Sequence, residues 1–133
     1  MSDKAFVDSN VILYLMSEDE TKANQAEAVM TNQVTVSVQV FNEVTSVARK
    51  KLGCSWDQIE EFLANIAGIC SIEPLTIEIH QRARFIAERY RLAFYDALIV
   101  ASALAAECST LYTEDMQDGL LIEGTLTLRN PFK

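Results

Sequence analysis

The stretch FVDSNVILYL, residues 6–15, decides how this chain folds. It opens with apolar residues typical of a buried strand, passes through Asp8, Ser9 and Asn10, and then becomes apolar again. Aspartate is unfavourable inside a strand, and a buried charge is rarely left unpaired. In an open α/β sheet, however, ligands bind at the carboxyl ends of the strands. We therefore expect Asp8 to be the first ligand of a metal site built from several separated acids.

The rest of the chain alternates short apolar strands with amphipathic helices. The expected strands, of which the last is a strand or an arm, are 5–7, 34–36, 69–72, 111–113, 121–122 and 124–133. The expected helices, of which the first is a short helix or a turn, are 11–16, 17–30, 38–52, 55–67, 76–90 and 92–107. This alternation predicts a three-layer α/β/α sandwich with a small, mostly parallel central sheet. Without repeats or linkers, residues 1–133 are expected to form one domain.

Two side chains that often bind ligands are expected to have structural roles. Trp56 lies at helical spacing with Ile59 and Ile66, so it is expected to pack against the core rather than to stack on bases. His80, the only histidine, has no Cys or His partner nearby in the sequence and is expected to be structural or on the surface. The cysteines match no metal-binding spacing and are expected to be small core residues: Cys54, Cys70 and Cys108.

The composition of the chain limits the classes of protein to which it can belong. Half of the residues are hydrophobic, which indicates a globular chain, yet no apolar run approaches the roughly 20 residues that span a bilayer. The polar start MSDKAFVD does not resemble a signal peptide, and the odd number of cysteines favours a reducing cytoplasm. The formal net charge of −8 argues against a broad electrostatic contact with nucleic acid but not against a local basic track.

Three further acids are expected near Asp8. Glu43 lies in the second turn of helix 38–52, Asp96 opens an almost wholly apolar helix, and Asp115 lies in a turn after the strand at 111–113. In a parallel sheet these positions gather at one edge. Each also has a simpler explanation: Glu43 as a solvated residue, Asp96 as a helix cap, and Asp115 as part of an exposed loop.

Four crowded carboxylates repel one another, and a divalent cation relieves the repulsion. Oxygen ligands suit Mg²⁺ or Mn²⁺ better than zinc. The chemistry that fits is hydrolysis of a phosphodiester, in which the metal acidifies a bound water and a spare carboxylate orients or deprotonates it. The sequence offers no Ser–His or Cys–His pair and no glycine-rich phosphate loop.

Four segments together resemble the PIN-domain ribonucleases, and among them the VapC-like toxins of bacterial type II toxin–antitoxin pairs: VDSNVILYL, VSVQVFNEV, YDALIVASAL and LYTEDMQDG. The resemblance covers nearly the whole chain. It implies that Asp8, Glu43, Asp96 and Asp115 are the catalytic acids and metal ligands, with Asp8 and Asp96 as the two principal ligands. Auxiliary roles fall on Asn10, Thr113 and Asp118.

The resemblance also implies Mg²⁺-dependent endonucleolytic cleavage of RNA, a homodimer, and a small antitoxin protein that blocks the site. Because the chain is acidic, RNA would need a narrow basic track. The candidate RNA contacts are Arg49, Lys50, Lys51, Arg82, Arg84, Arg89 and Arg91, for which solvated helix surface is the alternative.

Two other functions remain open at this point. A haloacid-dehalogenase-like hydrolase would use Asp8 as its nucleophile, but it would normally carry a second aspartate where this chain has Asn10. A non-catalytic PIN-like interaction module would keep the fold and a protein partner without cleaving RNA.

Overall fold

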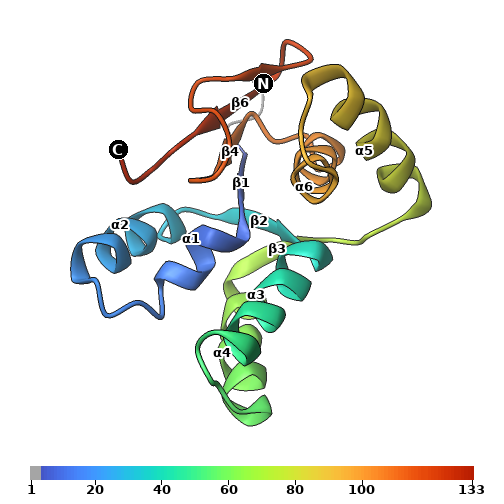
Figure 1. The fold of residues 1–133 in the computed structure, drawn as a ribbon. Helices are drawn as coiled ribbons and strands as arrows, with labels where there is room; N and C mark the ends of the chain where they lie inside the picture. Colours follow the sequence, from blue (N-terminus) through green and yellow to red (C-terminus); the bar gives the residue numbers. More distant parts are fainter. Residues whose placement is uncertain (1–3) are drawn as a thin grey trace.

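The computed structural model describes residues 4–133. Its strands are β1 (Ala5–Val7), β2 (Val34–Ser37), β3 (Cys70–Glu73), β4 (Thr110–Tyr112), β5 (Leu121–Ile122) and β6 (Leu126–Arg129). Its helices are α1 (Ser9–Tyr14), α2 (Glu20–Met30), α3 (Val38–Lys50), α4 (Trp56–Ile69), α5 (Ile77–Tyr90) and α6 (Phe94–Ala105). The strands form one sheet in the order β3-β2-β1-β4-β6-β5, in which only the β5–β6 pair of the described strands is antiparallel (Figure 1).

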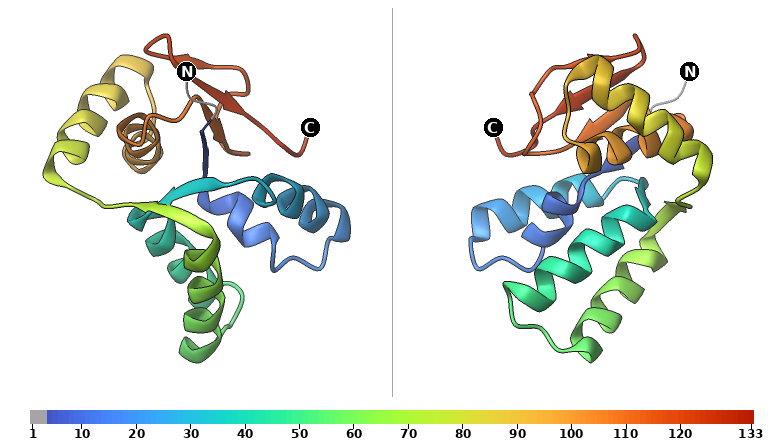
Figure 2. Two further views of the ribbon diagram at one scale, coloured as in Figure 1. Left: turned by 180° about the vertical axis from the view of Figure 1, so that it is seen from behind. Right: turned by 45° about the vertical axis from the view of Figure 1, so that its right-hand side comes forward.

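Helices cover both faces of this sheet. α5 and α6 pack on each other on one side, whereas α1 to α4 lie on the other, and the α3–α4 hairpin projects away from the strands (Figures 1 and 2). The predicted three-layer α/β/α sandwich with a mostly parallel sheet is therefore confirmed. No helix within residues 4–133 is long and apolar enough to cross a bilayer.

The core fills both faces of the sheet, and α6 is its most deeply buried helix. Every residue of α6 from Ala97 to Leu104 is buried, as expected for a helix that is apolar on nearly every side. Phe6 and Val7 of β1 and Leu111 of β4 are fully buried. A strand with both faces covered favours apolar residues, and in this chain the polar residues after β1 begin at Asp8, at the sheet edge.

Local capping signals set most of the helix boundaries. The side chain of Ser37 accepts from the backbone of Val40 at the start of α3, and Ser55 with Gln58 forms a capping box at the start of α4. Asp8 caps α1, because its Oδ1 accepts from Ser9 N at 2.7 Å. The expected short helix or turn at 11–16 therefore begins earlier, directly after the strand.

Two expectations about burial are wrong. Trp56 is 62% exposed, because it is the first residue of α4 at the far end of the hairpin, beyond the reach of the sheet. Cys54 and Cys70 are only half-buried, and Cys108 alone of the cysteines lies in the core; all are free thiols. His80 is half-buried against the ring of Phe94, as a structural role predicts.

Candidate active site

Parallel pairing places polar residues at one edge of the sheet. β1 lies between β2 and β4, and the backbone N–H of Asp8 continues this pairing by donating to Tyr112 O at 3.0 Å. Glu43 reaches the edge from the second turn of α3, which follows β2 directly, and Asp115 reaches it from the loop after β4. Asp96 lies in the first turn of α6.

Asp8 is the buried member of this group, with 3% of its surface exposed. Burial raises its pKa from 3.8 to about 7, and the negative charges of Glu43 and Asp96 act in the same direction. Hydrogen bonds to Asp8 from Thr113 Oγ1 at 2.8 Å and Ser9 N at 2.7 Å oppose that rise. The carboxylate is thus held in place at a position where its charge is costly.

Asp96 is half-buried and belongs to the same electrostatic group. Burial raises its pKa, and the charges of Asp115 and Glu43 raise it further. The N-cap of α6 is Ala93, and no side chain makes a capping hydrogen bond there, so helix capping does not explain Asp96. Through these charge interactions, Asp8, Glu43, Asp96 and Asp115 form one acidic site.

Neutral side chains stand between the acids. Ser9 Oγ lies 2.8 Å from Glu43 Oε1 and 3.4 Å from Asp8 Oδ1. Asn10 Nδ2 likewise lies 3.0 Å from Asp115 Oδ2 and 3.4 Å from Asp8 Oδ2. These donors partly offset the repulsion between the carboxylates that they join.

The donor chemistry of the acidic site fits a hard divalent cation, since all its ligands would be carboxylate oxygens. Within residues 4–133, however, no three or more His, Cys, Asp or Glu side chains stand in an arrangement that would hold a metal ion. Binding a cation would therefore require side chains of the site to turn toward one another.

A second network holds the loop that carries Asp115. Glu114 accepts from Tyr14 Oη at 2.5 Å and from Lys22 Nζ at 2.8 Å, and its backbone N–H donates to Asn10 Oδ1 at 3.2 Å. Burial alone would raise the pKa of Glu114, but the hydrogen bonds from Lys22 and Tyr14 outweigh it and the pKa is lowered. The loop after β4 is thereby tied to both α1 and α2.

Sequence reasoning missed several supporting residues. Ser9 directly follows Asp8 in the DSN stretch, and this neighbourhood was the signal in the sequence that could have found it. Gln39, which donates to Glu43 Oε2 at 3.2 Å, lies one helical turn before that glutamate, a spacing that places the two on one face. Tyr14, Lys22 and Glu114 carried no such signal, because Tyr14 and Lys22 come from different helices and Glu114 lies 100 positions beyond Tyr14.

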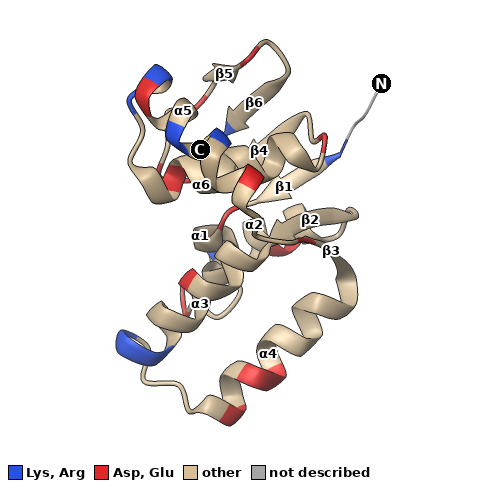
Figure 3. Cartoon of the chain, turned by 90° about the vertical axis from the view of Figure 1, so that its right-hand side faces the viewer, with Lys and Arg blue, Asp and Glu red and all other residues tan. Residues whose placement is uncertain are grey.

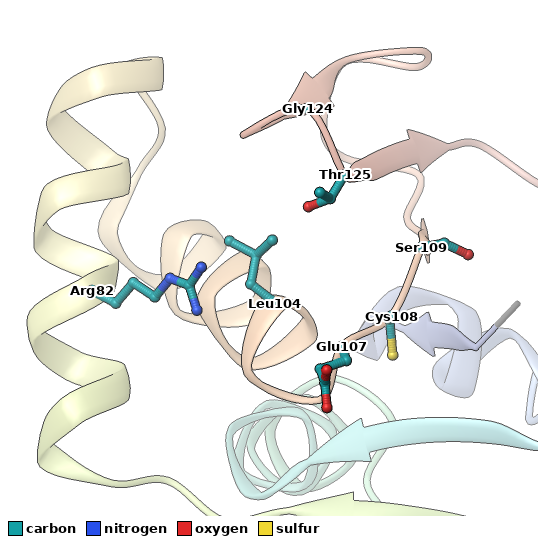
Figure 4. Close-up of a pocket in the computed structure, with 7 residues that line it drawn as sticks. All are labelled: Arg82, Leu104, Glu107, Cys108, Ser109, Gly124 and Thr125. Atoms are coloured by element: carbon teal, nitrogen blue, oxygen red, sulfur yellow. The ribbon is translucent and has the colours of Figure 1, made fainter. Parts of the chain in front are cut away.

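Asp118 and the basic residues do not join the acidic site. Asp118 Oδ1 accepts from Asn130 N at 2.8 Å, so its carboxylate holds the C-terminal segment instead. Arg82 pairs with Glu123 at 2.9 Å and lines a separate cavity of about 500 Å³, between α5, the end of α6 and the β5–β6 turn (Figure 4). The remaining candidate contacts lie on the surface at the end of α3 or along and after α5: Arg49, Lys50, Lys51, Arg84, Arg89 and Arg91.

Comparisons with known proteins agree with this arrangement. The family model of the PIN domain matches residues 5–117. Similar solved structures include a toxin–antitoxin complex from Klebsiella pneumoniae, with a TM-score of 0.72, 22% identity, and coverage of 96% of this chain and 97% of that one. Another is VapC20 from Mycobacterium tuberculosis, a toxin that cleaves the sarcin–ricin loop, with a TM-score of 0.67, 19% identity, and coverage of 84% and 89%.

A further similar structure is VapBC2 from Rickettsia felis bound to a DNA fragment from the promoter, with a TM-score of 0.67, 20% identity, and coverage of 96% and 98%. No curated protein matches the chain significantly. At these identities the solved structures establish the fold, and the family model covers most of the sequence. With its acids gathered at the carboxyl edge of a parallel sheet, this chain belongs to the PIN-domain family.

Proposed function

We propose that this protein is a metal-dependent endoribonuclease and the toxin of a toxin–antitoxin pair. The observation that carries the proposal is the acidic site, in which four carboxylates from distant segments interact at one sheet edge. Similarity to VapC20, a toxin that cleaves RNA, supports the choice of substrate. Family membership leaves no support for a haloacid-dehalogenase-like hydrolase.

Each residue of the site has a proposed role. Asp8 and Asp96 would be the principal ligands of Mg²⁺ or Mn²⁺, with Glu43 and Asp115 as further ligands or as the group that orients the attacking water. When bound, such a cation withdraws charge from phosphoryl oxygens and makes a coordinated water more acidic. Thr113 fixes the orientation of Asp8 through its hydrogen bond.

The partners are part of the proposal. Toxin–antitoxin complexes among the similar structures support a cognate antitoxin protein as the regulator of this chain. We also propose a homodimer, a cytoplasmic location, and a single nuclease domain that spans the chain. Arg49, Lys50, Lys51, Arg84, Arg89 and Arg91 are exposed and remain candidate phosphate contacts, whereas Arg82 is already paired.

Cleavage of RNA by the purified protein tests this function. Activity should require Mg²⁺ or Mn²⁺, stop with a chelator, and fall to background in Asp8→Asn and Asp96→Asn. Glu88→Gln, a change to an exposed acid on α5, is the matched control and should remain active. Full activity in Asp96→Asn would contradict the proposal.

The non-catalytic alternative makes a different prediction. An interaction module would bind its protein partner but would show no heat of Mn²⁺ binding by calorimetry and no cleavage of RNA. RNA cleavage that is lost in Asp96→Asn would exclude it.

A further inference from the structure

The turn between α3 and α4 presents an exposed aromatic side chain in a fixed orientation. Trp56 is 62% exposed, and the guanidinium carbon of Arg49 lies 4.7 Å from the centre of its ring. Arg49 Nη1 also donates to Cys54 O at 2.9 Å, which ties the arginine to the turn. Trp56 therefore offers an aromatic surface to the solvent beside an arginine.

Unpaired cations surround this stacked pair. Lys50 and Lys51 follow Arg49, and all three are exposed at the end of α3 (Figure 3). Among residues 4–133 the ion pairs form elsewhere, namely Lys22–Glu114, Arg82–Glu123 and Lys133–Asp118. Cations at a helix C-terminus are favoured by the helix dipole, but the dipole does not explain an adjacent exposed tryptophan.

The acidic residues of α4 limit the extent of this basic surface. Asp57, Glu60 and Glu61 are exposed in the first turns of that helix. A polyanion would therefore approach from the α3 side of the tip. In a chain of net charge −8, this arrangement gives a narrow track rather than a broad basic face.

A groove lies between α1 and the end of α3, beside the tip. Its volume is about 630 Å³, and its lining is mostly apolar, with Asn10 at one end and the acidic Glu18 among its residues. Asn10 is the side chain that hydrogen-bonds Asp115. Along α3, the rise from Glu43 to Lys50 is about 10 Å. One extended strand of nucleic acid can therefore contact the tip and the acids together.

We propose that Trp56 and Arg49 form a stacking platform for a base of single-stranded RNA, with Lys50 and Lys51 on the flanking phosphates. The RNA then runs along α3 toward the acidic site. Aromatic stacking beside cations is the usual way in which proteins hold single strands, whereas a duplex keeps its bases stacked on one another. This inference rests on the proposed ribonuclease function and specifies the class of substrate and a surface that holds it.

Trp56 is the only tryptophan in the chain, so its fluorescence reports on the platform directly. The protein for this experiment is Asp96→Asn in Mg²⁺, which should bind RNA without cutting it. Titration with a short, dye-labelled single-stranded RNA of mixed sequence should quench tryptophan fluorescence in parallel with the rise in dye anisotropy. The same RNA in a duplex should give no quenching.

Matched variants separate stacking from general surface effects. Trp56→Ala should weaken RNA binding about tenfold, the loss expected for one stacked base, whereas Trp56→Phe should keep most of the affinity. Phe85→Ala, which removes an aromatic that is 55% exposed on α5, should bind as tightly as the parent. In Lys50→Ala and Lys51→Ala, the slope of log affinity against log salt should become shallower by roughly 0.7 for each phosphate that the lysine no longer neutralises. Thermal unfolding verifies that each variant is folded.

Several results would overturn the platform. One is RNA binding, seen by anisotropy, without any change in tryptophan fluorescence. Another is equal RNA affinity in Trp56→Ala and Phe85→Ala, and a third is quenching by a protein partner or a second copy of the chain but not by RNA.

Cleavage kinetics distinguish this failure from failure of the proposed function. With Asp96 intact, Trp56→Ala should raise KM and leave kcat nearly unchanged, because a remote binding contact acts on the ground state and transition state alike. If the protein is an active nuclease and Trp56→Ala leaves its KM unchanged, the platform is disproved but the proposed ribonuclease function stands. If the wild-type protein cuts no RNA in Mg²⁺ or Mn²⁺, the proposed ribonuclease function itself is disproved.

Discussion

Thr113 Oγ1 donates a buried hydrogen bond of 2.8 Å to Asp8 Oδ2, which joins two residues 105 positions apart in the sequence. Thr113 is 1% exposed, and the same oxygen accepts from Asp115 N at 3.3 Å. A single hydroxyl thus links the acid after β1 with the loop after β4. This link explains why a small hydroxyl residue, rather than any small residue, suits the position.

Replacing Thr113 with the nearly isosteric valine should destabilise the protein by about 1.5–3 kcal/mol at neutral pH, the usual cost of removing a hydrogen bond to a charged group. Nuclease activity should fall as well, because Asp8 loses its orientation. Thr113→Ser keeps the hydroxyl and should remain close to wild type. Urea unfolding and cleavage rates check both variants, and equal stability of the valine and serine proteins would show that the hydrogen bond contributes little.

The raised pKa of Asp8 predicts a characteristic pH dependence of stability in the absence of metal. Between pH 3.8 and about 7 the folded protein binds a proton at Asp8 that the unfolded chain has released. The contribution of this group to the free energy of unfolding therefore falls as pH rises, by about 4 kcal/mol in all. Asp8→Asn removes this dependence and should be the more stable protein at about pH 8.

Urea unfolding in chelator, from about pH 4 to about pH 8, measures this effect as the difference between wild type and Asp8→Asn. The difference removes the groups that do not interact with Asp8 and keeps Asp8 together with the acids that its charge affects. Parallel stability curves for the two proteins would contradict the prediction. Adding Mn²⁺ at high pH should restore stability to the wild type far more than to Asp8→Asn, because a cation that binds only the folded state stabilises it.

Asp115 and Asp118 should differ in their effects on catalysis although they lie in the same loop. Asp115 adds its charge to the acidic site, whereas Asp118 Oδ1 accepts from Asn130 N. Asp115→Asn should therefore reduce RNA cleavage strongly, while Asp118→Asn should leave the rate within about threefold and lower stability by about 1 kcal/mol. Cleavage rates and melting temperatures of the two variants, measured side by side, test this assignment. A large loss of activity in Asp118→Asn, with the variant shown to be folded, would mean that Asp118 belongs to the acidic site.

The contacts of Lys22 predict that a residue outside the acidic site affects activity more than stability. Lys22 lies 3.0 Å from Tyr14 Oη and 2.8 Å from Glu114 Oε2. Because this ion pair is partly exposed, Lys22→Met should cost less than about 1 kcal/mol of stability. It should nevertheless loosen the loop that carries Asp115, which should appear as faster amide exchange at 114–118 and severalfold slower cleavage.

Lys133→Met is the matched control for Lys22→Met. Lys133 is also a lysine near an acid, but its Nζ lies 3.9 Å from Asp118 Oδ2 and it is more exposed. Its replacement should alter neither exchange nor cleavage. Equal behaviour of the two variants would show that the contacts of Lys22 do not position the loop.

The sequence alone determined the class of fold and the edge at which the acids lie. Apolar runs interrupted by capping residues such as Ser37 and Ser55 define strands and helices through interactions within a few residues. A parallel sheet then brings the ends of its strands to one edge, so Asp8 and Asp115 could be assigned there without coordinates.

Only the tertiary structure decided which polar groups meet at that edge and what covers the surface. Asn10 stands between two acids, Asp118 turns to the C-terminal segment, and Trp56 is exposed instead of buried. Each outcome depends on distances between segments that are far apart in sequence or on how far a hairpin extends from the sheet. Local propensity and periodicity describe neither the distances between segments nor the reach of the hairpin, because both are set only when the whole chain packs.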